Sequence, residues 1–200
     1  MAGTWLLHRA VRPVLVLLCS APALYLLAGA VLDQLGPNPA EALIRGTGDW
    51  TLRWLCAVLA VTPVRLMFGL PALARWRRTL GLTVFAYATL HLLCYAWLDM
   101  GLDWTDMSQD LAKRPFILVG FVTWLVLCAL AATSFNAAVR WLGGRRWQWL
   151  HRAVYLVAPL AILHFYWMRA GKQNFTDVVM YALVLALLLG WRWRRRWRGY

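Results

Sequence analysis

The chain is made up largely of apolar runs that are long enough to cross a lipid bilayer. A helix needs about 20 predominantly apolar residues to span a hydrocarbon core of ~30 Å. Six such runs occur, at residues 13–32, 50–70, 79–98, 115–135, 147–168 and 177–192. The whole chain of 200 residues is 62% hydrophobic, with a mean hydropathy of +0.57. The sequence therefore predicts an all-α polytopic membrane protein, a six-helix transmembrane bundle that forms one domain over residues 1–200.

The first run resembles a signal peptide only in its basic flank, at Arg9 and Arg12. Its apolar stretch is long and meets no small-x-small cleavage site before Gly29 and Ala30. We expect it to be a retained membrane span.

The distribution of charge predicts the orientation of the spans. Lys and Arg in excess mark the cytoplasmic side of a membrane protein. If the N-terminus is inside, most of the 21 basic residues fall on inner segments and all 8 acidic residues fall outside. The inner set is Arg9, Arg12, Arg65, Arg75, Arg77, Arg78, Arg140, Arg145, Arg146, Arg152, Arg192, Arg194, Arg195, Arg196 and Arg198. We therefore predict that both termini are cytoplasmic.

The net charge of +13 does not indicate a nucleic-acid-binding protein, because the basic residues follow the membrane topology. The C-terminal tail WRWRRRWRGY is typical of an interfacial anchor against anionic lipid headgroups. The four cysteines are scattered, with no CxxC pair and no CxxCH motif, which excludes covalent c-type haem attachment by pattern. We expect them to be small buried hydrophobic residues.

Three histidines lie inside or at the edge of the apolar runs and are the candidate functional residues: His91, His151 and His164. Ionisable residues inside a membrane are functional candidates by default, and neutral imidazole is a good ligand for haem iron. His91 is about 18 Å into its run and His164 about 25 Å into its own, at 1.5 Å per residue. With both runs directed outward, these two reach similar depths in the outer half, whereas His151 stays near the cytoplasmic face. We predict one bis-histidine haem between His91 and His164.

His151 is the candidate ligand of a second haem. On a straight helix it would stand about 140° from His164, although Pro159 between them predicts a kink. At the matching depth of the third run stand Arg77 and Arg78 rather than a histidine. Arginine at that depth suits a propionate or a phosphate, and His8 is only a weak alternative partner.

Four segments carry a recognisable pattern: RRTLGLTVFAYATLHLLCYAW, KRPFILVGFVTWLVLCALAATS, WQWLHRAVYLVAPLAILHFYW and the loop NPAEALIRGTGDW. Together they resemble the MsrQ family, within the ferric-reductase-like transmembrane superfamily, and the resemblance covers nearly the whole chain. The superfamily typically has two histidines on each of two spans. This chain matches at His91, His151 and His164 and departs at the inner histidine of the third run.

The resemblance implies a b-type haem subunit of the bacterial inner membrane, with FMN also associated with the family. It implies electrons from the quinol pool or a cytosolic flavin reductase, and a periplasmic molybdopterin-dependent methionine-sulfoxide reductase as the acceptor. We expect an electron-transfer subunit rather than a catalytic one. A haem in the outer half leaves the inner half of the membrane to a second haem, a flavin or a quinol. The alternatives are a membrane ferric reductase and a haem-free membrane scaffold.

Overall fold

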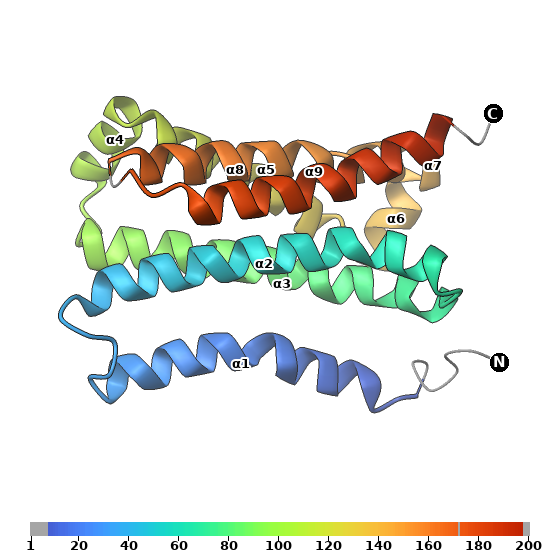
Figure 1. The fold of residues 1–200 in the computed structure, drawn as a ribbon, viewed down its shortest axis with the longest axis horizontal. Helices are drawn as coiled ribbons and strands as arrows, with labels where there is room; N and C mark the ends of the chain where they lie inside the picture. Colours follow the sequence, from blue (N-terminus) through green and yellow to red (C-terminus); the bar gives the residue numbers. More distant parts are fainter. Residues whose placement is uncertain (1–7, 172, 198–200) are drawn as a thin grey trace. The chain divides into compact units, whose positions relative to one another are not determined.

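A computed structural model describes residues 8–171 and 173–197, and within them the chain is helical, with no strand. Lys172 and residues 198–200, which include Arg198 of the predicted tail anchor, lie outside the described residues. The α-helices, labelled in Figure 1, are α1 (Val11–Val31), α2 (Pro39–Met67), α3 (Trp76–Cys94), α4 (Trp104–Lys113), α5 (Pro115–Ala132), α6 (Asn136–Leu142), α7 (Gly144–His151), α8 (Val154–Ala170) and α9 (Thr176–Trp197). A 3-10 helix (Pro71–Arg75) precedes α3, and a π-helical turn (Tyr95–Asp99) follows it.

The structure confirms the predicted class of an all-helical, multi-pass membrane protein. Six helical segments of the described chain are long and apolar enough to cross a membrane. They are Val11–Val31, Pro39–Met67, Pro71–Asp99, Pro115–Ala132, Gly144–Ala170 and Thr176–Arg195. Each overlaps one of the six predicted runs, and the cytoplasmic location of the termini stays a prediction.

By its internal contacts the chain divides into two compact units. The first unit contains the residues up to Asp99 and those from Leu188 onward, and the second contains Met100–Leu187. Helix α9 therefore contributes its first part to the second unit and its last part to the first. The predicted single domain stays a prediction.

The first unit is built on the pairing of α2 with α3, which α1 contacts as well. Tyr87 of α3 fastens α1 through its hydroxyl, which accepts from Ala23 N at 2.9 Å and donates to Cys19 O at 2.8 Å. Arg192 of α9 donates to Leu59 O of α2 at 2.5 Å. A buried apolar cluster of this unit joins α1, α2, α3 and the 3-10 helix, and it consists of Cys19, Val61, Ala72, Leu73 and Leu80.

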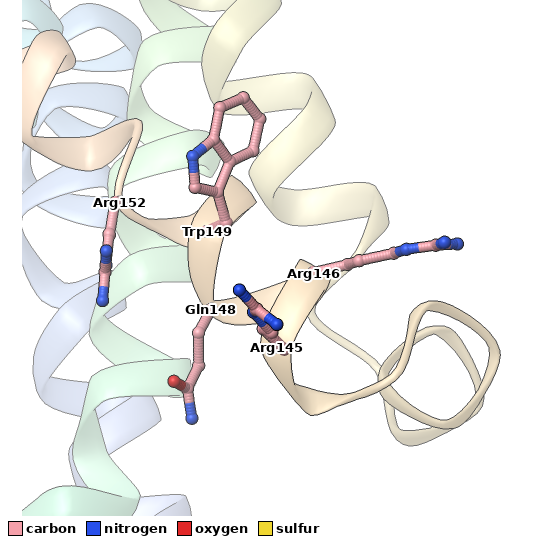
Figure 2. Close-up of a pocket in the computed structure, with 5 residues that line it drawn as sticks. All are labelled: Arg145, Arg146, Gln148, Trp149 and Arg152. Atoms are coloured by element: carbon pink, nitrogen blue, oxygen red, sulfur yellow. The ribbon is translucent and has the colours of Figure 1, made fainter.

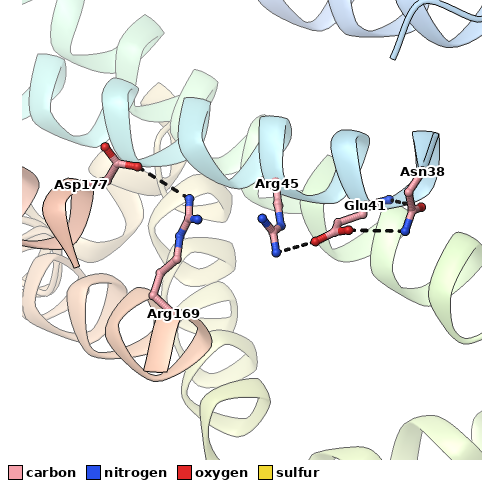
Figure 3. Close-up of polar contacts among 5 residues, drawn as sticks. All are labelled: Asn38, Glu41, Arg45, Arg169 and Asp177. Atoms are coloured by element: carbon pink, nitrogen blue, oxygen red, sulfur yellow. Dashed lines mark hydrogen bonds and ion pairs between the residues drawn. The ribbon is translucent and has the colours of Figure 1, made fainter. Parts of the chain in front are cut away.

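Helix α2 begins earlier than predicted and passes straight through two glycines. Asn38 is the N-cap, accepting from the Glu41 backbone N–H at 3.1 Å, and Pro39 occupies the first turn, where it is well tolerated. Glu41 also pairs with Arg45 one turn further on (Figure 3). The description of NPAEALIRGTGDW as a loop is therefore wrong from Pro39 onward, because this capped start continues through Gly46 and Gly48 as one helix of 29 residues.

The second unit is built on the pairing of α5 with α8. Buried side chains from both helices fill its interior: Thr123, Leu127, Leu130, Val157, Ala158 and Phe165. The connection from α8 to α9 is held by an ion pair between Arg169 and Asp177, whose closest atoms are 3.7 Å apart (Figure 3). The acidic loop before α5 contains the short helix α4, which is capped by Asp103 and has no buried residue.

The fifth spanning segment is interrupted near its start. Helix α7 ends at His151, a turn follows at Arg152 and Ala153, and α8 begins at Val154. Pro159 lies inside α8. His151 and His164 are therefore on two different helices, so the predicted angle of about 140° for a single straight helix does not apply.

Candidate functional site

His91 lies in the last turn of α3 and makes a hydrogen bond to the backbone of α2. Its Nδ1 is 2.8 Å from Ile44 O. The ring is half-buried in the first unit. This contact fixes the ring against α2 at the part of that helix that the sequence had suggested was a loop.

His164 has a matching environment in the second unit. It lies on α8, and its Nδ1 is 2.6 Å from Phe116 O in the first turn of α5. The rings of Phe116 and His164 are tilted by 47° with centroids 6.1 Å apart. A residue of the neighbouring spanning helix thus orients this ring as well.

Both contacts determine the tautomer of the neutral imidazole. A carbonyl oxygen can only accept, so Nδ1 of His91 and of His164 must carry the hydrogen. In a neutral ring Nε2 then holds the lone pair. Metal-ligating histidines usually donate their other N–H to a carbonyl, carboxylate or water, which fixes the tautomer and raises ligand basicity. The two rings therefore fit the requirements of axial haem ligands.

His91 belongs to the first unit and His164 to the second. The structure describes each ring within its own unit. Their pairing across one haem stays a prediction.

The hydrogen bond of His151 is made by Nε2 rather than Nδ1, and it reaches a side chain instead of a backbone carbonyl. Nε2 is 3.0 Å from Thr133 Oγ1, while that hydroxyl donates to Ala129 O at 2.7 Å. The single hydroxyl hydrogen is used in that bond, so Nε2–H is the donor to Thr133 in this arrangement. Trp147 stacks on the ring, with centroids 4.1 Å apart. To present Nε2 to an iron, His151 would have to give up the contact with Thr133.

The predicted partners of His151 have local contacts of their own. Arg77 Nη2 lies 2.6 Å from Thr62 Oγ1, within the first unit. His8 accepts from Ala10 N at 3.2 Å and is exposed.

A basic surface surrounds α7. Five residues line a pocket of about 490 Å³: Arg145, Arg146, Gln148, Trp149 and Arg152. Figure 2 shows their side chains spreading from the helix in different directions, so the guanidinium groups do not converge on a single point. Such a surface suits phosphate groups at a membrane face, and it lies on a segment that the charge pattern assigns to the cytoplasm.

The parts of the candidate site that the sequence did not disclose are the backbone carbonyls of Ile44 and Phe116, which contact the two histidines. A backbone acceptor leaves no trace in residue type, so histidine identity and depth were the only available signals. All four cysteines are free thiols. Cys19 is buried and the others are half-buried, so the prediction of small buried hydrophobic residues is confirmed fully only for Cys19.

Comparison with known proteins gives a consistent family assignment. The family model for the "Ferric reductase like transmembrane component" matches residues 47–162. A protein of Polaromonas naphthalenivorans named "Protein-methionine-sulfoxide reductase heme-binding subunit MsrQ" is 58% identical over 98% of this chain and 91% of its own length. Proteins of the same name from Ralstonia nicotianae and Azospira oryzae are 52% and 51% identical, over 96% and 92% of this chain and 88% and 78% of their own lengths. No solved structure matches the chain.

Proposed function

This chain belongs to the ferric-reductase-like transmembrane family and, within it, to the MsrQ subunits, and on that premise we propose that it is a b-type haem electron-transfer subunit of a methionine-sulfoxide reductase system. The observation that carries the proposal is the pair of histidines, His91 and His164, each donating Nδ1–H to a backbone carbonyl of a neighbouring spanning helix. The protein is the electron carrier, and the catalytic site belongs to its partner.

In this proposal His91 and His164 would hold one haem b through their imidazole rings. When bound, the haem supplies a one-electron redox centre that the side chains of this protein lack. The protein's part is to hold the two rings, keep the hydrogen on Nδ1 and present the lone pair of Nε2. The apolar spanning helices exclude water around this site, which raises the energy of added charge and so influences the reduction potential.

The proposed electron route runs outward across a bacterial inner membrane. The donor is the quinol pool or a cytosolic flavin reductase, and the acceptor is a periplasmic molybdopterin-dependent reductase that repairs oxidised proteins. Reduction of one methionine sulfoxide to methionine and water consumes two electrons and two protons. A one-electron carrier must therefore pass two electrons for each sulfoxide that is repaired.

His151 remains the candidate ligand for a second haem on the cytoplasmic side. Because Thr133 already occupies its Nε2, we expect one haem per chain, with a quinol or FMN as the source of electrons in the inner half of the membrane. FMN enters through the family resemblance alone, and no residue of this chain is assigned to it. The basic surface around α7 contacts lipid phosphates in this proposal.

The first test is the haem content of purified His91→Ala, His164→Ala and His151→Ala proteins. We expect the first two to lose haem by at least roughly 10-fold, since even an outer partner of a metal ligand changes affinity by that factor. His151→Ala should keep a haem-to-protein ratio near one and the same absorption spectrum.

His8→Ala is the matched control, because His8 is exposed and lies before the first span. Normal haem in both His91→Ala and His164→Ala would disprove the pairing. A halved haem content in His151→Ala, with the parent holding two haems, would instead establish a second site.

A second test addresses the partner. The protein is co-purified with the candidate periplasmic molybdopterin subunit, its haem is reduced chemically, and methionine sulfoxide is added anaerobically. We expect re-oxidation of the haem only when both the subunit and the sulfoxide are present. Haem that stays reduced in the complete mixture would contradict the proposed acceptor.

A membrane ferric reductase is the alternative, favoured by the family model that matches residues 47–162. That activity would use the same haem but would reduce a ferric chelate without a periplasmic subunit. Oxidation of the reduced haem by ferric citrate, with no response to methionine sulfoxide and its reductase, would support it. A protein purified without any haem would point instead to a membrane scaffold.

A further inference from the structure

The two histidine contacts share more than a hydrogen bond to a carbonyl. In each, a glycine follows the accepting residue by four positions, Gly48 after Ile44 and Gly120 after Phe116. Residues four apart lie on the same face of a helix. The glycine therefore lies one turn along from the carbonyl, on the side of the helix that faces the histidine.

The histidine rings occupy the space that a side chain at these glycines would need. A Cβ on Gly48 would lie 3.2 Å from both Cε1 and Nδ1 of His91. A Cβ on Gly120 would lie only 2.7 Å from Nδ1 and 2.8 Å from Cε1 of His164. A methyl group at either position would push against the edge of the ring that carries the hydrogen-bonding nitrogen.

A threonine completes the pattern three residues after each glycine. Thr51 Oγ1 donates to Thr47 O at 2.8 Å, and Thr123 Oγ1 donates to Val119 O at 2.7 Å. These bonds satisfy each hydroxyl within its own helix. We call the set of carbonyl residue, glycine at +4 and threonine at +7 the histidine-contact motif. It reads IRGTGDWT at 44–51 and FILVGFVT at 116–123.

The spacing to the histidine is also repeated. His91 follows Ile44 by 47 residues, and His164 follows Phe116 by 48. Each unit thus carries the same arrangement: a helix with the motif, and a later helix whose histidine lies against it. The two sequences share little beyond the glycine and threonine, so similarity of residues alone does not reveal the repeat.

We propose that Gly48 and Gly120 are positioning residues, each of which lets the histidine of its own unit, His91 or His164, lie against the motif helix in the orientation needed to ligate the haem. This inference rests on the proposed function, in which His91 and His164 ligate the haem. The glycines let each ring approach its motif helix closely enough for Nδ1 to reach the carbonyl. Both rings then present Nε2 in the same tautomer, and both gain ligand strength from the same type of hydrogen bond.

The test uses alanine at each glycine in the full-length, haem-loaded protein. We expect Gly120→Ala to lower haem affinity by roughly 10-fold or more, the scale seen when an outer partner of a metal ligand is disturbed. Haem that remains bound should have altered low-spin signals in electron paramagnetic resonance and a shifted midpoint potential, because the imidazole is turned. Gly48→Ala should change the same quantities in a smaller degree, because its Cβ meets the ring at 3.2 Å rather than 2.7 Å.

Gly81→Ala and Gly190→Ala are the matched controls. Both glycines lie in spanning helices, and a Cβ there would meet nothing within 4 Å. Both controls should retain the parental haem content, resonance signals and potential. If alanine acts only through a general effect on the helices, the control variants should change in haem content, resonance signals and potential as much as the motif variants do. That result would overturn the inference.

The outcomes separate this inference from the proposed function. If His164→Ala loses haem while Gly120→Ala keeps the parental signals and potential, the positioning role is wrong and the haem site stands. If His91→Ala and His164→Ala both keep their haem, the proposed function itself fails. If Gly120→Ala does not accumulate in the membrane, the milder Gly48→Ala decides, and parental signals in that variant would overturn the inference.

Discussion

At the scale of single residues, the hydroxyl of Tyr87 stands out because it is inserted into the backbone of another helix. It bridges Ala23 N–H and Cys19 C=O, which are four residues apart in α1 and would otherwise bond directly to each other. Pro22 opens the ladder at this place, since it has no N–H and its ring crowds the preceding turn. Tyr87 satisfies two backbone groups and ties α1 to α3.

We predict that Tyr87→Phe destabilises the protein by about 1 kcal/mol. A buried interhelical hydrogen bond in a membrane protein contributes about that amount, and here the two released groups can partly re-pair with each other. The measurement is the free energy of unfolding in mixed detergent micelles.

Tyr25→Phe on α1 is the control, because the Tyr25 side chain is exposed and its ring faces away from the core. Equal stability of the Tyr87 and Tyr25 variants would show that the bridge contributes nothing.

The sequence predicted the side chains of the candidate site but not the backbone groups and glycines that they contact. His91 and His164 were identified because ionisable residues are rare in apolar spans. Gly48 lies in the segment that was predicted to be a loop and Gly120 in a predicted span, and neither glycine was linked to a histidine. In the structure each glycine lies against a histidine ring, Gly48 against His91 and Gly120 against His164. This contact depends on which helices pair, and the periodicity of a single sequence does not show that.

At the scale of helices, the C-terminal end of α5 is linked to α7 by two hydrogen bonds that share Thr133. Trp147 Nε1 donates to Thr133 O at 2.8 Å, and the same threonine contacts His151 through its hydroxyl. Thr133 is the C-terminal cap residue of α5, so these bonds satisfy groups that a helix end leaves open. The short helix α7 is thereby attached to α5 through Trp147 and His151.

We predict that Thr133→Val leaves the haem spectrum and haem content unchanged. It should lower the free energy of unfolding by about 1 kcal/mol, because it removes the hydrogen bond to His151 and the hydroxyl's contacts with the carbonyls of Ala129 and Leu130 in its own helix. The measurements are optical spectra and detergent unfolding. Thr83→Val on α3 is the comparison, because Thr83 Oγ1 donates to Thr79 O of its own helix at 3.0 Å. A changed haem spectrum in Thr133→Val would instead assign His151 as a ligand.

At the scale of the whole molecule, hydropathy alone predicted the class and the number of spans, because a bilayer demands long apolar helices. Helix boundaries were predicted less well. Residues 39–49 were assigned to a loop for their prolines, glycines and charges, yet Asn38, Pro39 and Glu41 cap a helix that continues through them. In the fifth span the break came at Arg152, next to the basic segment, and α8 continues through Pro159.

The length of α2 has a consequence for how fast electrons move. Its 29 residues extend about 43 Å, well beyond a ~30 Å hydrocarbon core. Ile44 lies only about 8 Å from the start of α2, and Phe116 is the second residue of α5. In the predicted orientation both starts are on the periplasmic side. If His91 and His164 hold the haem as proposed, its iron would be a short tunnelling step from a docked periplasmic reductase and a long one from the cytoplasm. The supply of electrons from inside, rather than their delivery outside, would then limit the rate of repair.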